Sequence, residues 1–223
     1  MTKHYDVTAL GEVLIDFTED GSSAQGNPMY EANPGGAPCN VLAMLQKFGH
    51  KTAFLGKVGE DIFGRRLEIV LKEAGIDTAG LCMDPTVRTT LAFVEKKADG
   101  DRDFSFYRNP GADMMLRTEE LQEQILKDTR IFHFGTLSMT DEPVRSATRH
   151  AIETAKANGA LLSFDPNIRE PLWQSMEEAK RQTAYGMEVC DVLKISDNEI
   201  RWFTGEEDFD RGVDKLWREY HIP

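Results

Sequence analysis

Apolar positions along the chain follow two spacings, one typical of buried strands and one typical of amphipathic helices. Residues 7–17 are apolar and rich in β-forming side chains, interrupted at 11–12, and predict a first strand that begins in the core. Apolar residues at intervals of three and four predict helices over 41–48 and 67–74, each closed by a glycine. Residues 52–58 predict a strand between them, so the chain opens with the order strand, helix, strand, helix.

Two stretches interrupt this alternation, at about residues 17–34 and 89–110. The first is polar, carries glycine, serine and proline, and suits an exposed excursion. The second contains two short β-like runs, 91–95 and 104–107, joined by 98–101, where Asp-Gly is a hairpin signal. We expect the two stretches to pair with each other as a small β lid on the main domain.

Alternation resumes after the second stretch and continues along the chain. It predicts an α/β fold in three layers, with a mostly parallel central sheet covered by helices on both faces. We take residues 1–223 as one domain that carries the lid. Residues 221–223 follow the last helix directly, where an α/β chain would loop back into another strand, so we expect the fold to be truncated at its C-terminus.

The remaining predicted helices cover 119–127, 143–158, 176–189, 197–203 and 213–220, and the remaining strands cover 131–134, 161–165 and 192–195.

Composition narrows the classes of partner. The chain carries 26 Lys and Arg against 38 Asp and Glu, a net charge of -12, which repels nucleic-acid backbones and anionic membrane surfaces. We therefore expect no nucleic acid and no membrane partner, although a helix N-terminus can still hold a nucleotide phosphate. Cys39, Cys82 and Cys190 are widely spaced and form no C-x-x-C pair, which argues against disulfides and thiolate zinc. Without a signal-peptide pattern, the chain is predicted to be cytoplasmic.

Paired glycines precede the first predicted helix. Gly35 and Gly36 allow close backbone approach, and Asn40 offers both a donor and an acceptor to a hydroxylated ligand. Asp16 ends the first predicted strand, which is where open α/β sheets bind ligands. The glycines also suit a plain helix cap, and Asp16 also suits a solvated carboxylate, so the residues alone leave both interpretations open.

The second excursion ends on an aromatic residue and a cation, Tyr107 and Arg108. The guanidinium of Arg108 could bind a hydroxyl or phosphate in a forked geometry. A surface arginine is the competing interpretation. Without other information the pattern does not separate the two.

A buried strand over 161–165 runs directly into a polar segment. Asp165, Asn167 and Arg169 are three polar side chains within five positions. Such a density of polar groups at the end of a strand favours a binding site over a plain loop. These residues are therefore candidate ligand contacts.

The strand over 192–195 is likewise followed at once by a helix start. Lys194 lies in the strand, and Ser196 with Glu199 has the spacing of a capping box, which would be a purely structural device. The alternative is that Glu199 orders water around a hydrated magnesium ion, because Mg²⁺ prefers carboxylates and retained waters. Both remain open at this point.

Taken in order, these segments resemble the ribokinase-like carbohydrate kinases, and among them the fructokinases most closely. Residues 10–16 (Leu-Gly-Glu-Val-Leu-Ile-Asp) are similar to the opening strand of that family. Segment 34–43 (Pro-Gly-Gly-Ala-Pro-Cys-Asn-Val-Leu-Ala), together with 56–64 (Gly-Lys-Val-Gly-Glu-Asp-Ile-Phe-Gly), resembles its N-terminal signature. Segments 163–169 and 196–199 match later blocks. The specificity lies in the combination, which extends over nearly the whole chain.

The resemblance implies a three-layer ribokinase-like fold and transfer of the γ-phosphoryl group of ATP to a primary sugar hydroxyl, with Mg²⁺ as cofactor. Closure of the lid over the sugar would exclude water. It also implies roles for individual residues. Asp16, Gly35, Gly36 and Asn40 would hold the sugar, with Tyr107 and Arg108 closing from the lid, while Asp165, Asn167, Arg169, Lys194 and Ser196 would lie near ATP, and Glu199 would serve the magnesium shell.

One departure from the family pattern concerns the catalytic base. The family carries it in a Gly-Ala-Gly-Asp block, and no such tetrapeptide occurs in these 223 residues. The positions that Asp16 and Asp165 match have other roles, so neither supplies the base. We therefore assign no catalytic residue, expect the base to lie beyond Pro223, and expect the 223 residues alone to be inactive or nearly so.

Two alternatives remain. One keeps the fold and changes the substrate to a nucleoside or a sugar acid. The other is a non-catalytic sugar-binding module that retains the substrate half. The resemblance further suggests a homodimer formed through the lid.

Overall fold

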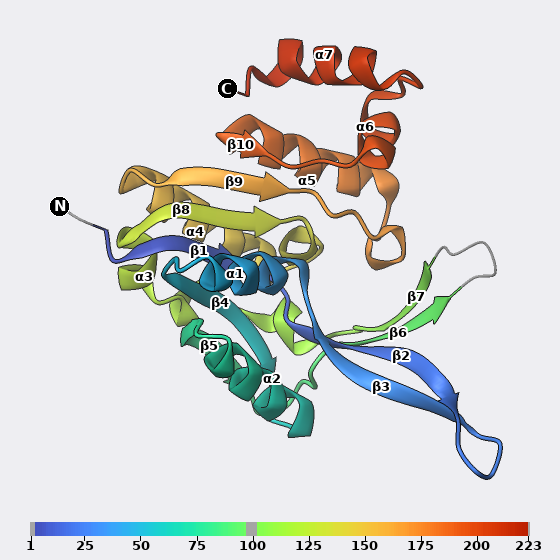
Figure 1. Ribbon diagram of the computed structural model, residues 1–223. Coiled ribbons are helices and arrows are strands. Elements are labelled where there is room, and N and C mark those ends of the chain that lie inside the picture. Colours follow the sequence, from blue (N-terminus) through green and yellow to red (C-terminus); the bar gives the residue numbers. More distant parts are fainter. Residues whose placement is uncertain (1–2, 97–101, 223) are drawn as a thin grey trace.

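The structure, a computed structural model, describes residues 3–96 and 102–222 (Figure 1). A central sheet of six strands has the order β10-β9-β8-β1-β4-β5, and all of its neighbouring pairs are parallel. Parallel strands need helical crossovers, which is why helices cover this sheet. Its strands are β1 (Tyr5–Leu10), β4 (Thr52–Gly59), β5 (Asp77–Asp84), β8 (Thr129–Gly135), β9 (Leu161–Asp165) and β10 (Val192–Leu193).

Two apolar cores lie on opposite faces of the central sheet. Because side chains alternate along β1, Val7 and Ala9 lie in one core and Leu10 lies in the other. The first core also contains Leu42 and Leu67, which belong to the two helices in front of the sheet in Figure 1. Helices α1 and α2 cover the first face, and α3, α4 and α5 cover the second. The helices are α1 (Ala37–Lys47), α2 (Ile62–Glu73), α3 (Glu123–Lys127), α4 (Val144–Ala157), α5 (Met176–Val189), α6 (Asp197–Thr204) and α7 (Phe209–Tyr220).

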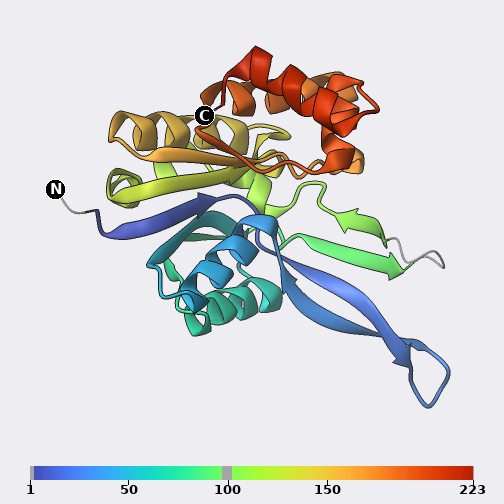
Figure 2. The same cartoon turned by 45° about the horizontal axis from the view of Figure 1, so that its top comes forward.

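A second, smaller sheet projects from the edge where the central strands end (Figure 2). Its order is β3-β2-β6-β7, with β2 antiparallel to β3 and parallel to β6. Residues from two distant parts of the chain therefore pair in one sheet, as predicted. We call it the small sheet; its strands are β2 (Leu14–Ser22), β3 (Pro28–Gly35), β6 (Leu91–Lys96) and β7 (Arg102–Tyr107).

The predicted α/β class, the parallel central sheet and the small second sheet are confirmed. The single strand predicted over 7–17 is in fact two, because the chain leaves the central sheet after β1 and enters the small sheet at β2. The edge strand β5 was not predicted, since its burial follows no simple alternation. The predicted turn at 98–101 lies outside the described residues. Within residues 3–96 and 102–222, every helix is too short or too polar to cross a bilayer.

Candidate functional site

The predicted sugar-binding residues gather where the small sheet meets α1. Asp16 on β2 pairs with Asn33 on β3, and its carboxylate lies over Gly35, where a Cβ would overlap Oδ2 of Asp16. Gly36 has φ of 118°, and a Cβ there would lie 2.5 Å from the backbone oxygen of Glu12. Both glycines are thus required by close approach of neighbouring groups.

Asn40 is exposed on the first turn of α1 and shares a pocket with Gly35. The pocket has a volume of about 290 Å³ and lies between α1 and α2. Most of its wall is apolar, so the polar groups lie at only a few points. The lining residues are Val13, Pro34, Gly35, Cys39, Asn40, Ala43, Leu67, Val70, Leu71, Ala74 and Ile76.

The register of the small sheet separates Tyr107 from Asp16. Asp16 pairs with Ala92, and Ala92 pairs with Phe106, so these three side chains share one face. Tyr107 is next to Phe106 and lies on the opposite face, where its ring centroid is 5.3 Å from that of Phe93. Phe106, which sequence analysis did not single out, shares the face of Asp16.

Arg108 is buried where β7 returns to the main domain. Its Nε donates to Oδ2 of Asp113 at 2.8 Å, Nη1 donates to Thr140 Oγ1 at 3.0 Å, and Nη2 donates to the Leu137 carbonyl at 2.8 Å. Its side chain is 1% exposed. In this structure the guanidinium is a link between the end of the small sheet and the segment after β8.

The predicted phosphate-side residues follow β9 and β10, which are neighbours in the central sheet. Asp165 is buried at the end of β9, and Lys194 Nζ lies 3.2 Å from its carboxylate. The Lys194 side chain is 63% exposed, so it can turn toward an anion. Asn167 has a positive φ of 47°, which Asn tolerates better than most residues.

Glu199 ties the loop after β9 to the start of α6. Its Oε1 accepts from the Ile168 N–H at 2.9 Å, and its Oε2 accepts from the Ser196 N–H at 2.9 Å and hydroxyl at 2.7 Å. The predicted capping box is therefore present. In the part of the chain that the structure describes, no group of three or more His, Cys, Asp or Glu side chains could hold a metal ion.

A small cavity of about 10 Å³ separates the phosphate-side candidates Asp165 and Asn167 from the start of α1; the sugar-side candidates Asp16, Gly35, Gly36 and Asn40 do not line it. Glu12 and the start of α1 line it from one side, and Asp165 and Asn167 line it from the other. His133 also lines it; burial lowers the pKa of His133, and the Asp165 carboxylate opposes that change. Sequence analysis missed Glu12 and His133 as site residues. The break in the apolar run at 11–12 was the signal that could have indicated Glu12.

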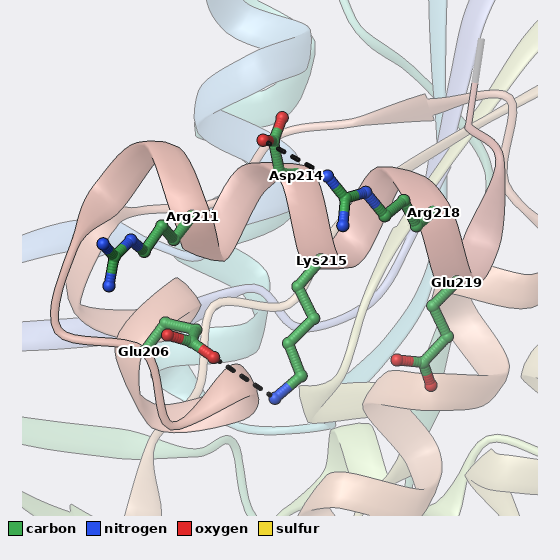
Figure 3. A pocket seen from close by; sticks show the side chains of 6 residues that line it. All are labelled: Glu206, Arg211, Asp214, Lys215, Arg218 and Glu219. Atoms are coloured by element: carbon green, nitrogen blue, oxygen red, sulfur yellow. Dashed lines mark ion pairs between the residues drawn. The ribbon is translucent and has the colours of Figure 1, made fainter.

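A hollow larger than the two above lies elsewhere, on α7 and the segment before it (Figure 3). It has a volume of about 530 Å³ and is lined by three cations and three anions. Lys215 pairs with Glu206 at 3.8 Å and Arg218 pairs with Asp214 at 3.9 Å. Because these exposed charges neutralise one another, we place the candidate site at the strand ends instead.

Polar side chains at the carboxyl edge of a parallel sheet are the arrangement with which open α/β proteins bind ligands, and this chain has that arrangement beside its small sheet. The family described as "pfkB family carbohydrate kinase" matches residues 5–218. This chain belongs to that family.

Named relatives are similar over most of the chain. Fructokinase-1 of Zea mays is 46% identical over 215 residues, which cover 95% of this chain and 67% of the relative. Probable fructokinase-2 of Arabidopsis thaliana is 45% identical over 92% of this chain and 63% of its own length. The chain thus spans about two thirds of these relatives.

Solved structures of fructokinases have the same fold. The fructokinase of Xylella fastidiosa has a TM-score of 0.87 at 35% identity, covering 96% of this chain and 66% of that one. The fructokinase of Vibrio cholerae O395 in its fructose, ADP and calcium ion bound form has a TM-score of 0.86 at 30% identity, covering 98% and 69%.

Proposed function

We propose that the protein is an ATP-dependent sugar kinase that phosphorylates a primary hydroxyl of fructose. The observation that supports this proposal is that only a small cavity separates Asp165 and Asn167, on the phosphate side, from the start of α1, the helix that begins after Gly36 and carries Asn40. Family membership and the fructokinase relatives support the same chemistry.

On the sugar side, Asp16, Gly35, Gly36 and Asn40 would bind hydroxyls. Asp16 supplies acceptors, Asn40 supplies a donor and an acceptor, and the glycines let the sugar approach the backbone. Tyr107 stays a proposed contact from the small sheet. It would have to act from a different face of that sheet than Asp16.

Arg108 is proposed as a second contact from the small sheet. Its three side-chain nitrogens already donate hydrogen bonds to protein groups. Arg108 would therefore act on the sugar mainly through the electrostatic potential of its positive charge and by holding β7 in place.

On the phosphate side, the cation of Lys194 would move from Asp165 to the phosphates of ATP. Asn167, Arg169 and Ser196 would donate hydrogen bonds nearby. Such positioning and charge neutralisation account for most of the catalysis in phosphoryl transfer.

Mg²⁺ would neutralise the charge on the phosphate oxygens. Glu199 uses three of the roughly four acceptor positions of a carboxylate within the protein, leaving one at Oε1. This fits contact with a water of a hydrated magnesium ion better than direct coordination.

A screen of phosphoryl acceptors with ATP and Mg²⁺ tests the proposal on the full-length protein. Fructose should be phosphorylated with the highest kcat/KM among ketohexoses, aldohexoses, nucleosides and sugar acids. If a nucleoside or a sugar acid is the preferred acceptor, the protein is still a kinase, but the proposal of fructose as its substrate is wrong. Calorimetric binding of fructose without any binding of ATP would instead indicate a sugar-binding module.

The 223 residues by themselves are proposed to be inactive or nearly so, because no Gly-Ala-Gly-Asp block occurs in them. General base catalysis contributes about 10² to 10⁴ in rate, so kcat of this chain should be lower than that of the full-length protein by a factor in that range. Equal rates for the two would refute this assignment of the base.

We further propose a homodimer that forms through the small sheet, in the cytoplasm. Met29, Tyr30 and Tyr107 are large apolar or aromatic side chains exposed on this sheet, and exposed apolar patches often mark interfaces. Light scattering should give twice the monomer mass, and Tyr30→Asp should shift the protein toward the monomer.

A further inference from the structure

Glu12 lies where the chain passes from the central sheet to the small sheet. It follows β1, which ends at Leu10, and precedes β2, which begins at Leu14. Its side chain is buried, and the roles proposed above do not use it. A buried carboxyl group at a junction between two sheets requires a partner.

That partner is the start of α1. Oε1 of Glu12 accepts a hydrogen bond from the Ala37 N–H at 2.9 Å. The N-cap residue of α1, Gly36, has no side chain to cap the helix, and the first turn carries no acidic residue of its own. Glu12, 25 residues earlier in the sequence, therefore supplies the cap and places an acidic group at the positive end of the helix dipole.

The backbone around Glu12 also fits tightly against this turn. A Cβ on Gly11 would lie 2.6 Å from Cγ of Pro38, and a Cβ on Gly36 would lie 2.5 Å from the Glu12 carbonyl oxygen. The junction between the sheets and the first turn of α1 are thus in contact through both backbone and side chain. A shift of either one would move the other.

The charged groups near Glu12 are Arg108 and Asp113, which follow β7 in the chain. Burial raises the pKa of Glu12 to about 7, the Ala37 N–H opposes that rise, and Asp113 raises it while Arg108 lowers it. The Glu12 carboxyl can therefore be protonated, and uncharged, near neutral pH. A glutamine at this position should consequently be tolerated.

We propose that Glu12 is a positioning residue for sugar binding: by capping α1 from the junction between the sheets, it holds Gly35, Gly36 and Asn40 in place relative to Asp16. This inference rests on the proposed sugar-kinase function. It predicts a defect in sugar binding that depends on hydrogen-bonding reach and is independent of charge.

Three substitutions test the proposal, with fructose and ATP affinities measured separately by calorimetry on the 223-residue chain and by KM on the full-length protein. Glu12→Ala should weaken fructose binding by up to about tenfold, the loss expected for one hydrogen bond. Glu12→Gln keeps an acceptor at the same reach and should stay close to the unsubstituted protein. Glu12→Asp keeps the charge but is one methylene too short, so it should resemble Glu12→Ala. ATP affinity should be unchanged in all three.

Glu19→Ala, on an exposed part of β2, serves as the matched control and should change neither affinity. The proposal is overturned if Glu12→Asp binds fructose as well as Glu12→Gln, or if fructose and ATP affinities fall together. If Glu12→Ala does not fold, the comparison of Glu12→Gln with Glu12→Asp still decides. Failure of the unsubstituted protein to bind or phosphorylate any sugar would instead refute the proposed function, so the two failures are distinguishable.

Discussion

The guanidinium carbon of Arg169 lies 5.5 Å from the centroid of the Phe104 ring, which places a cation over an aromatic face. Phe104 belongs to β7 of the small sheet, and Arg169 belongs to the loop after β9. The same loop is held by Glu199 through the Ile168 N–H. A continuous series of contacts therefore leads from the small sheet to the start of α6.

This contact predicts an energetic coupling between Phe104 and Arg169. In a double-mutant cycle with Phe104→Leu and Arg169→Gln, the free energy of unfolding should show a coupling of about 0.5–1 kcal/mol, as for a partly exposed cation–π pair. Urea denaturation measures it. Tyr107→Leu, on the other face of the sheet, is the matched control and should show no coupling to Arg169. Equal coupling for both aromatic residues would contradict the observed geometry.

The buried ion pair of Arg108 and Asp113 predicts a large loss of stability when one partner is removed. Arg108→Ala leaves the Asp113 carboxylate buried without its cation and should lower the free energy of unfolding by about 3–5 kcal/mol. Arg218→Ala removes an exposed arginine whose pair with Asp214 spans 3.9 Å, and should cost at most about 0.5 kcal/mol. A similar small cost for both would mean that Arg108 is exposed in solution.

Gly36 should tolerate substitution less well than Gly49, although both have positive φ angles. A Cβ on Gly36 meets the backbone of Glu12, whereas a Cβ on Gly49 has no atom within 4 Å. We expect Gly36→Ala to lower the free energy of unfolding by about 2–4 kcal/mol and Gly49→Ala by about 1 kcal/mol. Denaturant unfolding of the two variants provides the comparison, and equal losses would show that backbone strain alone matters.

The lowered pKa of the Asp84 carboxyl leads us to expect a loss of stability in acid. Burial would raise the pKa of its carboxyl, but hydrogen bonds from the Val87 and Thr86 N–H groups, the Thr86 hydroxyl and Lys57 lower it from 3.8 to about 2. Because the folded-state pKa is below the unfolded one, its stabilising contribution is full above pH 4 and disappears as the pH falls through 2.

Asp84→Asn tests this expectation. The variant should be less stable than the unsubstituted protein at pH 7, and the difference should shrink as the pH falls from about 4 to 2. Thermal unfolding as a function of pH measures both. A difference that stays constant down to pH 2 would show that Asp84 does not titrate in this window.

Much of the fold could be predicted because its signals are local. The helix predicted over 176–189 coincides with α5, and the spacing of Ser196 and Glu199 predicted the capping box that the structure contains. Helix periodicity and capping depend on residues three or four positions apart, which are visible in the sequence itself.

The sequence by itself determined most of the order of strands and helices, with the exceptions of β5 and the break between β1 and β2, as well as the polar groups at the strand ends and the resemblance to a kinase family. Only the tertiary structure decided that Arg108 is buried, that Tyr107 and Asp16 lie on different faces, and that Glu12 caps α1. These facts depend on strand register and on contacts between residues far apart in the chain, such as the 25 positions between Glu12 and Ala37. Local spacing carries no information about such contacts, because they arise only when the two sheets and the helix are packed together.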